Sequence, residues 1–380
     1  MQEFCDLPVI DAHVHIMDQL SKDIKTVMDT IRSIHISSGL KAINLLSIPC
    51  INEYEPQILQ NLICIAYKAI YNTDTYAFGG LDYYLPGLSC ETYDFRGQGE
   101  RLIELGFDGI KFIESKPYVR KAIGDIPFTS EIYEGLFTYL EERSIPILWH
   151  AADPGYFWDA DLVPHWAVER GMFYGTGEYM SKEAYYKEVE DVLSKHPGLN
   201  IIFAHFFFLS ADMERADRFL DKWPNICFDV TPGVDMYEDF YTRSSDWRDF
   251  FIRHQDRIIF GTDTGYDIEN DPPAPAMVQF GKKKSNWVRR FLEDDESFTM
   301  FDSLNIMTRG IGLEEEALEK IYHANFMRFA GSVPIKVSIP GVMNYLYYIK
   351  NKIEGSRQIA GKNELLGRIS SIEDELRGIN

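Results

Sequence analysis

Short apolar segments recur along the chain, and amphipathic stretches separate them. Each segment is a short apolar run with Val, Ile, Leu or Phe as its main apolar residues, as expected for parallel strands that helices cover. We predict eight such strands, at residues 9–16, 41–48, 75–81, 107–114, 145–152, 200–207, 225–232 and 257–264.

The stretches between these segments have helical periodicity. Residues 23–34 place apolar side chains three and four positions apart, and 131–142, 183–193 and 212–220 follow the same pattern. Alternating strands and helices predict an α/β fold, either a (β/α)8 TIM barrel or a doubly wound open sheet. The barrel is favoured because no glycine-rich dinucleotide fingerprint follows the first strand.

The predicted barrel occupies residues 1–331, and residues 332–380 form a C-terminal helical extension. One amphipathic stripe runs through this extension, made of Leu365, Leu366, Ile369, Ile372 and Leu376. The stripe could cover the barrel or join two subunits, so a homodimer is one of two predictions.

Three long connections follow strands, at residues 82–94, 153–180 and 265–284. In a barrel they lie at the C-terminal face, where loops shape the substrate pocket. The second is rich in aromatic residues, and Tyr156 and Trp158 are our candidates for substrate contact. The run Lys282–Lys284 in the third is interpreted as a solvated face.

Composition narrows the class of partner. The 380 residues are 45% hydrophobic, and 38 Lys and Arg against 59 Asp and Glu give a net charge of −21. This predicts a globular protein and argues against nucleic acid or an anionic membrane as a partner, since both need a basic surface.

The five cysteines are scattered without a C-x-x-C pair, and the first strand leaves no room for a signal peptide. We therefore expect a reducing, cytoplasmic location.

Histidine and aspartate side chains gather at the predicted strand ends. His13 and His15 lie two positions apart, so they point to one face of the first strand. His150, His205 and Asp263 end the fifth, sixth and eighth strands. Active sites of barrels are built at such ends, and these groups can bind a metal or carry protons.

The words around these residues resemble a known family. Residues 9–15 read VIDAHVH, residues 150–154 read HAADP, and residues 321–331 read IYHANFMRFAG. They are similar to the amidohydrolase superfamily, and to its amidohydrolase-related branch with the aminocarboxymuconate semialdehyde decarboxylase group. The resemblance covers about residues 8–331 and leaves the tail outside.

The resemblance implies roles for individual residues. His13, His15, His150 and Asp263 match the ligands of one divalent metal ion, usually Zn²⁺, with Mn²⁺ as another candidate. His205 matches the histidine that orients or deprotonates the water that the metal activates, and Asp263 is expected to accept a proton as well.

Lys111 in the fourth strand has three open interpretations. It could be carboxylated and bridge a second metal ion, it could hold a substrate carboxylate, or it could form a structural salt bridge. Arg96, Arg170 and Arg243 are further candidates for binding a carboxylate.

We therefore expect a metal-dependent hydrolase acting on a small carboxylate-bearing amide, ester or lactone. The alternative is a metal-dependent, non-oxidative decarboxylase (a carboxy-lyase) of an aromatic or unsaturated acid. A third possibility is a barrel that only binds its ligand, because a fold alone does not determine the reaction.

Overall fold

The computed structural model describes residues 4–16, 22–51, 58–84, 92–233, 235–265, 272–301, 305–357, 359 and 361–379. The strands are β1 (Ile10–Val14), β2 (Ala42–Leu46), β3 (Thr75–Gly79), β4 (Gly109–Ser115), β5 (Ile147–Ala151), β6 (Ile201–Phe203), β7 (Ile226–Asp229), β8 (Ile258–Ile259), β9 (Ser297–Met300) and β10 (Ile306–Arg309). The α-helices are α1 (Ile24–Ser37), α2 (Gln60–Ile70), α3 (Phe95–Leu105), α4 (Pro117–Ala122), α5 (Glu131–Glu142), α6 (His165–Glu169), α7 (Lys182–Lys195), α8 (Met213–Lys222), α9 (Met236–Thr242), α10 (Ser244–Arg253), α11 (Ala274–Glu293), α12 (Glu315–Glu319), α13 (Asn325–Ala330), α14 (Ile339–Gly355) and α15 (Lys362–Arg377). Short 3-10 helices occupy Gly155–Trp158 and Gln255–Arg257, a turn with left-handed backbone conformations occupies Ala204–Phe208, and a π-helical turn occupies Lys320–Ala324.

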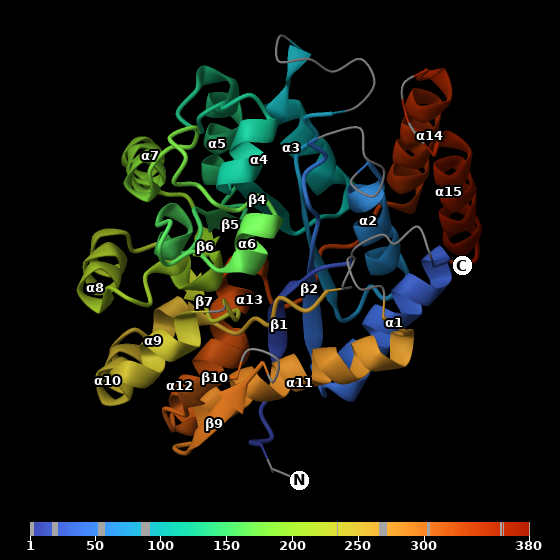
Figure 1. Cartoon of the computed structure of the whole chain (residues 1–380). Helices are drawn as coiled ribbons and strands as arrows, with labels where there is room; N and C mark the ends of the chain where they lie inside the picture. Colours follow the sequence, from blue (N-terminus) through green and yellow to red (C-terminus); the bar gives the residue numbers. More distant parts are fainter. Residues whose placement is uncertain are drawn as a thin grey trace.

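Strands β1 to β8 form one parallel sheet in sequence order. The segment after β8 returns to β1, because Val14 and Thr264 form a bridge and the amide of Ala12 donates to the carbonyl of Phe260 at 3.0 Å. The helices lie around this nearly closed sheet (Figure 1). The architecture is a (β/α)8 TIM barrel with a C-terminal helical region, which confirms the predicted fold class.

Seven of the eight barrel strands fall inside the predicted segments, and β4 extends one residue beyond its segment, to Ser115. Strands β6 and β8 are much shorter than predicted. β6 ends at Phe203, because His205 to Phe208 adopt left-handed backbone conformations with φ between 51° and 56°. Extended strand cannot continue through such residues, so the predicted end of this strand was wrong. The predicted loop 265–284 is also wrong in part, because α11 already begins at Ala274. Residues 266–271 of that loop, and 85–91 of the first loop, lie outside the described residues.

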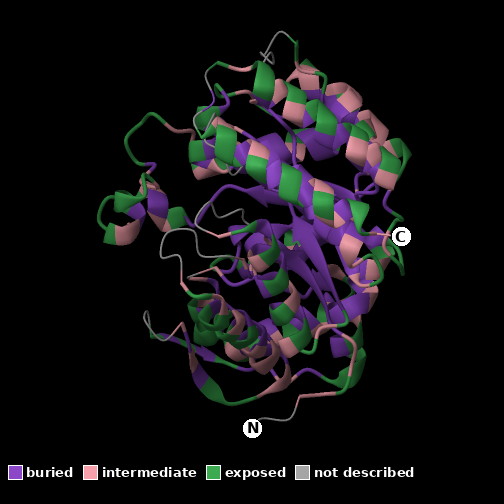
Figure 2. Cartoon of the chain, turned by 90° about the vertical axis from the view of Figure 1, so that its right-hand side faces the viewer, coloured by how far each residue is buried: buried purple, intermediate pink, exposed green. Residues whose placement is uncertain are grey.

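The strands are buried on both faces, which explains their continuous apolar sequence. Inside the barrel, a cluster including Ile10, Leu46, Tyr76 and Leu148 packs against Phe326 of α13. Outside, the helices present one apolar side to the sheet and a polar side to solvent, and Figure 2 shows the alternation of buried and exposed turns. Packing on both sides holds the strand ends rigidly where the candidate site lies.

The C-terminal helices pack against the barrel. α15 contacts α1, α2 and α14, and α14 also contacts α3 (Figure 1). Leu365, Ile369, Ile372 and Leu376 of the predicted stripe are buried in these contacts. The stripe is therefore used within the chain, as the first of the two predictions expected. No helix of the described residues combines the length and apolarity needed to cross a bilayer.

Candidate active site

A cavity of about 590 Å³ opens at the carboxyl ends of the barrel strands. Its described lining comes from strand ends, the connection after β5 and helix α11: His13, His15, Ile48, Lys111, Ile113, Lys116, His150, Asp153, Pro154, Phe157, Trp166, Arg170, Met172, His205, Phe208, Pro232, Gly233, Asp263, Gly265, Phe280 and Lys284. All five predicted strand-end residues line it, together with Lys111. The fold therefore brings residues from distant parts of the sequence to one cavity.

Three of the predicted ligands converge closely. The Nε2 atoms of His13 and His15 are 3.2 Å apart, and they lie 3.6 and 3.4 Å from Oδ1 of Asp263. Among the described residues, this is the group with ligand atoms close enough to share one metal ion. The register of β1 against β2 shifts between Asp11 and Val14, in the segment that carries the first imidazole.

Hydrogen bonds determine which nitrogen of each imidazole is free. His13 Nδ1 faces Oδ2 of Asp229 at 2.8 Å, and His15 Nδ1 faces the carbonyl of Leu46 at 3.1 Å. Both partners only accept, so each Nδ1 carries the hydrogen and each Nε2 keeps its lone pair. Burial lowers the pKa of His13 well below its ordinary value and that of His15 to about 4, so both rings are neutral. Two lone pairs and a carboxylate oxygen within 3.6 Å therefore fit a cation.

Two buried carboxylates support this arrangement, and sequence reasoning missed both. Asp229, at the end of β7, accepts from His13 and from the amides of His205 and Thr231. Asp11 accepts from the amides of His13 and Thr262 and from the Thr262 hydroxyl at 2.6 Å. Burial raises the pKa of Asp11 to about 7 and raises that of Asp229. The position of Asp229 at a strand end was the signal that could have revealed it.

Asp263 has a strained backbone, and the side chain of Lys284 contacts its carbonyl. Its φ of 52° is rare for a residue with a side chain, and such conformations concentrate at functional sites. Lys284 donates to the Asp263 carbonyl at 2.5 Å and is 9% exposed. The prediction that the whole Lys282–Lys284 run is solvated is therefore wrong for its last member.

His150 lies in the same cavity but outside the three-residue group. Its Nε2 is 3.3 Å from Oδ1 of Asp153, and its ring packs edge-on against His205. Asp153 also pairs with Lys116 at 3.1 Å and accepts from the Tyr174 hydroxyl at 2.7 Å. Although burial alone would raise it, these contacts lower the pKa of Asp153 to about 2. The role of His150 as a fourth ligand stays a prediction.

The ring of His205 has one nitrogen held by a hydrogen bond and one with a lone pair, and its role as a base stays a prediction. Its Nδ1 lies 3.3 Å from the carbonyl of Thr231, so that nitrogen carries the hydrogen and Nε2 keeps the lone pair. Its ring centre is 5.3 Å from that of His13. Burial lowers the pKa of His205, and a neutral imidazole can accept a proton.

Lys111 reaches the cavity from β4 with an unusual environment. The residue is 1% exposed, and its Nζ has no hydrogen-bond partner among the described residues. Burial lowers the pKa of Lys111 to about 8. The structural salt bridge considered for this residue is absent from the described residues.

Of the candidate arginines, Arg170 lines the cavity, whereas Arg96 and Arg243 pair with acidic residues on their own helices or nearby.

The aromatic connection after β5 folds over its own small core of Phe157, Ala167 and Tyr174. Phe157 and Trp166 line the cavity. Tyr156 and Trp158, the residues predicted to contact substrate, are part of this connection but are not among the described lining residues. The Trp158 indole instead donates to the carbonyl of Met180 at 2.8 Å.

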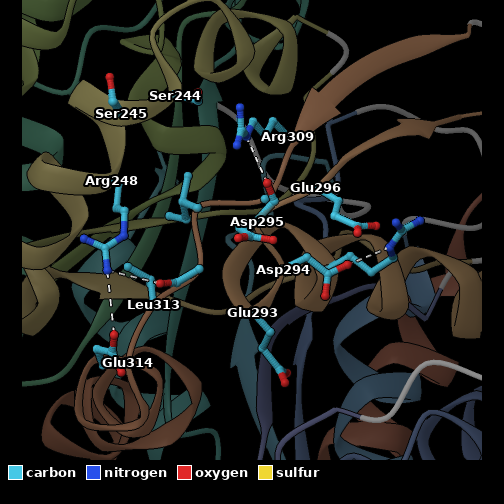
Figure 3. Close-up of a pocket in the computed structure, with 14 residues that line it drawn as sticks. Ser244, Ser245, Arg248, Glu293, Asp294, Asp295, Glu296, Arg309, Leu313 and Glu314 are labelled. Carbon is cyan, nitrogen blue, oxygen red and sulfur yellow. Dashed lines mark hydrogen bonds and ion pairs between the residues drawn. The ribbon is translucent and has the colours of Figure 1, made fainter.

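A larger cavity of about 950 Å³ lies elsewhere, between the start of α10 and the β9–β10 hairpin (Figure 3). Its charged groups have partners close by: Arg248 donates to the carbonyl of Gly312, and Arg309 to that of Asp295. None of the residues described as lining it is a predicted site residue. The volume of a cavity is therefore a poor guide to the site in this protein.

The fold and the site together define a (β/α)8 barrel with a group of histidines and an aspartate suited to a metal at its carboxyl face. The family model described as amidohydrolase matches residues 96–329, and the chain belongs to this amidohydrolase family. The match includes Lys111, His150, His205 and Asp263 and begins after His13 and His15. This confirms the resemblance to the superfamily, whose members typically bind divalent metal ions.

Solved structures are similar in fold. A putative amidohydrolase from Staphylococcus aureus is 16% identical, with a TM-score of 0.54 over 86% of this chain and 100% of that one. A 2,6-dihydroxybenzoate decarboxylase is 15% identical (TM-score 0.47, 85% and 98%), and a dihydroorotase from Saccharomyces cerevisiae is 12% identical (TM-score 0.48, 85% and 84%). At these identities the likeness concerns the fold. No curated protein matches the chain.

Proposed function

We propose that the protein is a metal-dependent hydrolase of a small carboxylate-bearing amide, ester or lactone. The observation that carries the proposal is the convergence of His13 Nε2, His15 Nε2 and Asp263 Oδ1 within 3.6 Å, with both imidazoles neutral. These residues, with His150 as a fourth, would hold one divalent ion, most simply Zn²⁺. A bound ion supplies Lewis acidity, which activates water and polarises a carbonyl.

The chain's own residues would perform the remaining steps. His205 Nε2 accepts a proton from the attacking water and returns it to the leaving group, while Thr231 holds the opposite nitrogen. Lys111 holds the substrate carboxylate, because its ammonium has no described partner in the cavity. Phe157 and Trp166 cover the substrate and limit the access of bulk water.

Decarboxylation is the second candidate, and Lys111 is the observation that favours it. A cation in the cavity would hold a carboxylate beside the three-residue group. The same His205 could then deliver a proton to carbon after CO₂ leaves. Product analysis separates the two reactions, since only the second releases CO₂.

The test combines metal content, measured by elemental mass spectrometry, with assays of hydrolysis and CO₂ release. We expect about one ion per chain, and His205→Ala should retain it while losing roughly 10²- to 10⁴-fold in rate, the typical contribution of a general base. His205→Ala with unchanged turnover would contradict its role.

His150→Ala is expected to lower the metal content. If the variant retains its metal, His150 is not a ligand and its contact with Asp153 is structural. Nearly two ions would make Lys111 a carboxylated bridge, and no ion after reconstitution would leave only a binding barrel.

A further inference from the structure

Helix α11 reaches the cavity because it packs unusually close to α1. A side chain at Gly281 would place its Cβ 2.6 Å from Cγ2 of Ile34, so only glycine permits this approach. Lys284 lies three positions later and therefore on the same side of the helix. It is 9% exposed and lines the cavity, while Lys282 is exposed.

The ammonium group of Lys284 forms no ion pair with a described residue, and the carboxylates of Asp263 and Asp11 offset its charge only in part. It donates to the carbonyl of Asp263, which is uncharged. Among the described residues, no carboxylate oxygen lies within 4 Å of its Nζ, although Asp263 and Asp11 act on it from farther away. Burial accordingly lowers the pKa of Lys284. A buried ammonium without a close carboxylate is costly unless a ligand compensates it.

Lys111 is in the same situation across the barrel. It has no hydrogen-bond partner among the described residues, whereas Lys116, the third lysine of the cavity, is paired with Asp153. Lys111 belongs to β4, and Lys284 donates to the carbonyl of Asp263, in the segment that follows β8. In a ring ordered β1 to β8 these strands are opposite each other, with the cavity between them. Two ammonium groups that form no ion pair with a described residue therefore face one cavity from two sides, each only partly compensated by carboxylates farther away.

We propose that the substrate carries two anionic groups, as a dicarboxylate does, and that Lys284 binds the second one while Lys111 binds the first. This inference rests on the proposed function, which places a carboxylate-bearing molecule in this cavity. Each ammonium would gain a charge-assisted hydrogen bond in place of its missing carboxylate partner. A substrate with one carboxylate would leave Lys284 uncompensated.

The test is calorimetric binding of benzoate and of the three benzenedicarboxylates, phthalate, isophthalate and terephthalate, to the zinc-loaded protein. The three isomers sample different spacings between the two charges. We expect at least one isomer to bind wild type about tenfold to a hundredfold tighter than benzoate, the range for one additional hydrogen bond to a charged group. Lys284→Met should lower the affinity for the dicarboxylates to that for benzoate and so abolish this preference. Lys284→Arg should retain most of the preference, and Lys282→Met is the matched control that should retain all of it.

Zinc content and the thermal unfolding midpoint of each variant establish that the site is intact. If Lys284→Met loses zinc or unfolds, Lys284→Gln replaces it, because its amide can still donate to the Asp263 carbonyl but carries no charge. Loss of the preference in Lys284→Gln supports the inference, and a preference that survives there overturns it. Equal affinity for benzoate and all three dicarboxylates in wild type overturns it, as does a preference that survives in Lys284→Met. Failure of benzoate and every dicarboxylate to bind would instead contradict the proposed carboxylate substrate itself.

Discussion

Asp229 shows how a residue outside the described lining of the cavity can control the chemistry of the site. It is fully buried and receives hydrogen bonds from His13, His205 and Thr231, so it fixes one predicted ligand and the predicted base together. A carboxylate behind a ligating imidazole sets its tautomer and raises its basicity. Its loss should therefore affect metal binding before it affects folding.

We expect Asp229→Asn to weaken zinc binding about 10- to 100-fold, the usual effect of removing such a partner. The amide keeps the shape of the side chain, but its nitrogen cannot accept the hydrogen of His13 Nδ1. Competition with a chelating dye measures the affinity. Asp246→Asn, at an exposed position, is the control and should bind zinc like wild type. Unchanged affinity in Asp229→Asn would contradict the role of this residue.

At the level of single residues, the sequence predicts which residues carry the site's chemistry better than it predicts which neighbours they contact. His13 and His15 were identifiable because their spacing places both on one face, and His150, His205 and Asp263 because each ends an apolar run. Lys284 could not be identified, since Lys282 and Lys283 beside it are exposed and only the approach of α11 to α1 buries the third lysine. Tyr156 and Trp158 are named by composition alone, and which aromatic residue faces a cavity depends on the path of the connection.

Among the elements, strand positions were predicted well and strand ends poorly. Apolar runs mark the buried part of each strand. The left-handed turn at His205–Phe208 contains no glycine or proline, so the sequence gives no signal that predicts it. The hydrogen bond from the His205 amide to Asp229 supports that turn, and Asp229 lies in another strand. Tertiary contacts thus override the preference of these residues for extended backbone at the point where the candidate site lies.

Helix α15 allows a test of what the C-terminal extension does. Ile369 is fully buried in the contact with the barrel helices, so Ile369→Ala should lower the free energy of unfolding by about 2–5 kcal/mol. Urea titration measures the change, and Ser370→Ala, at an exposed position, should have little effect. A variant that keeps its stability but changes its mass in sedimentation would show that the stripe joins subunits instead.

For the whole molecule, the buried histidines predict how metal and acid act together. A metal that binds only the folded chain stabilises it, by about 2.7 kcal/mol when its concentration is 100 times the dissociation constant. Protons compete for the same lone pairs, and burial lowers the pKa of His15 to about 4 and that of His13 well below its ordinary value. Proton competition should therefore begin only as the pH falls toward about 4.

The expected result is a rise in the unfolding midpoint on adding zinc that stays constant from pH 7 to about pH 5 and declines at lower pH. Differential scanning calorimetry with and without zinc measures it at each pH. Asp263→Asn, which removes a carboxylate ligand, should show little rise at any pH. A rise that already declines between pH 7 and 6 would mean that the histidines titrate at ordinary values.

The seam between the first and last strands has a consequence for how the protein is made. Asp11 and Thr262, which join the two ends of the barrel, lie 251 positions apart, and the groups next to them form the three-residue site. A chain emerging from the ribosome carries His13 and His15 from the beginning, but their carboxylate partner, Asp263, is added only after all eight barrel strands have been synthesised. If the proposed metal ion binds at these residues, it can bind only after the barrel is nearly complete, so a shortage of metal would leave folded barrels without the ion rather than unfolded chains.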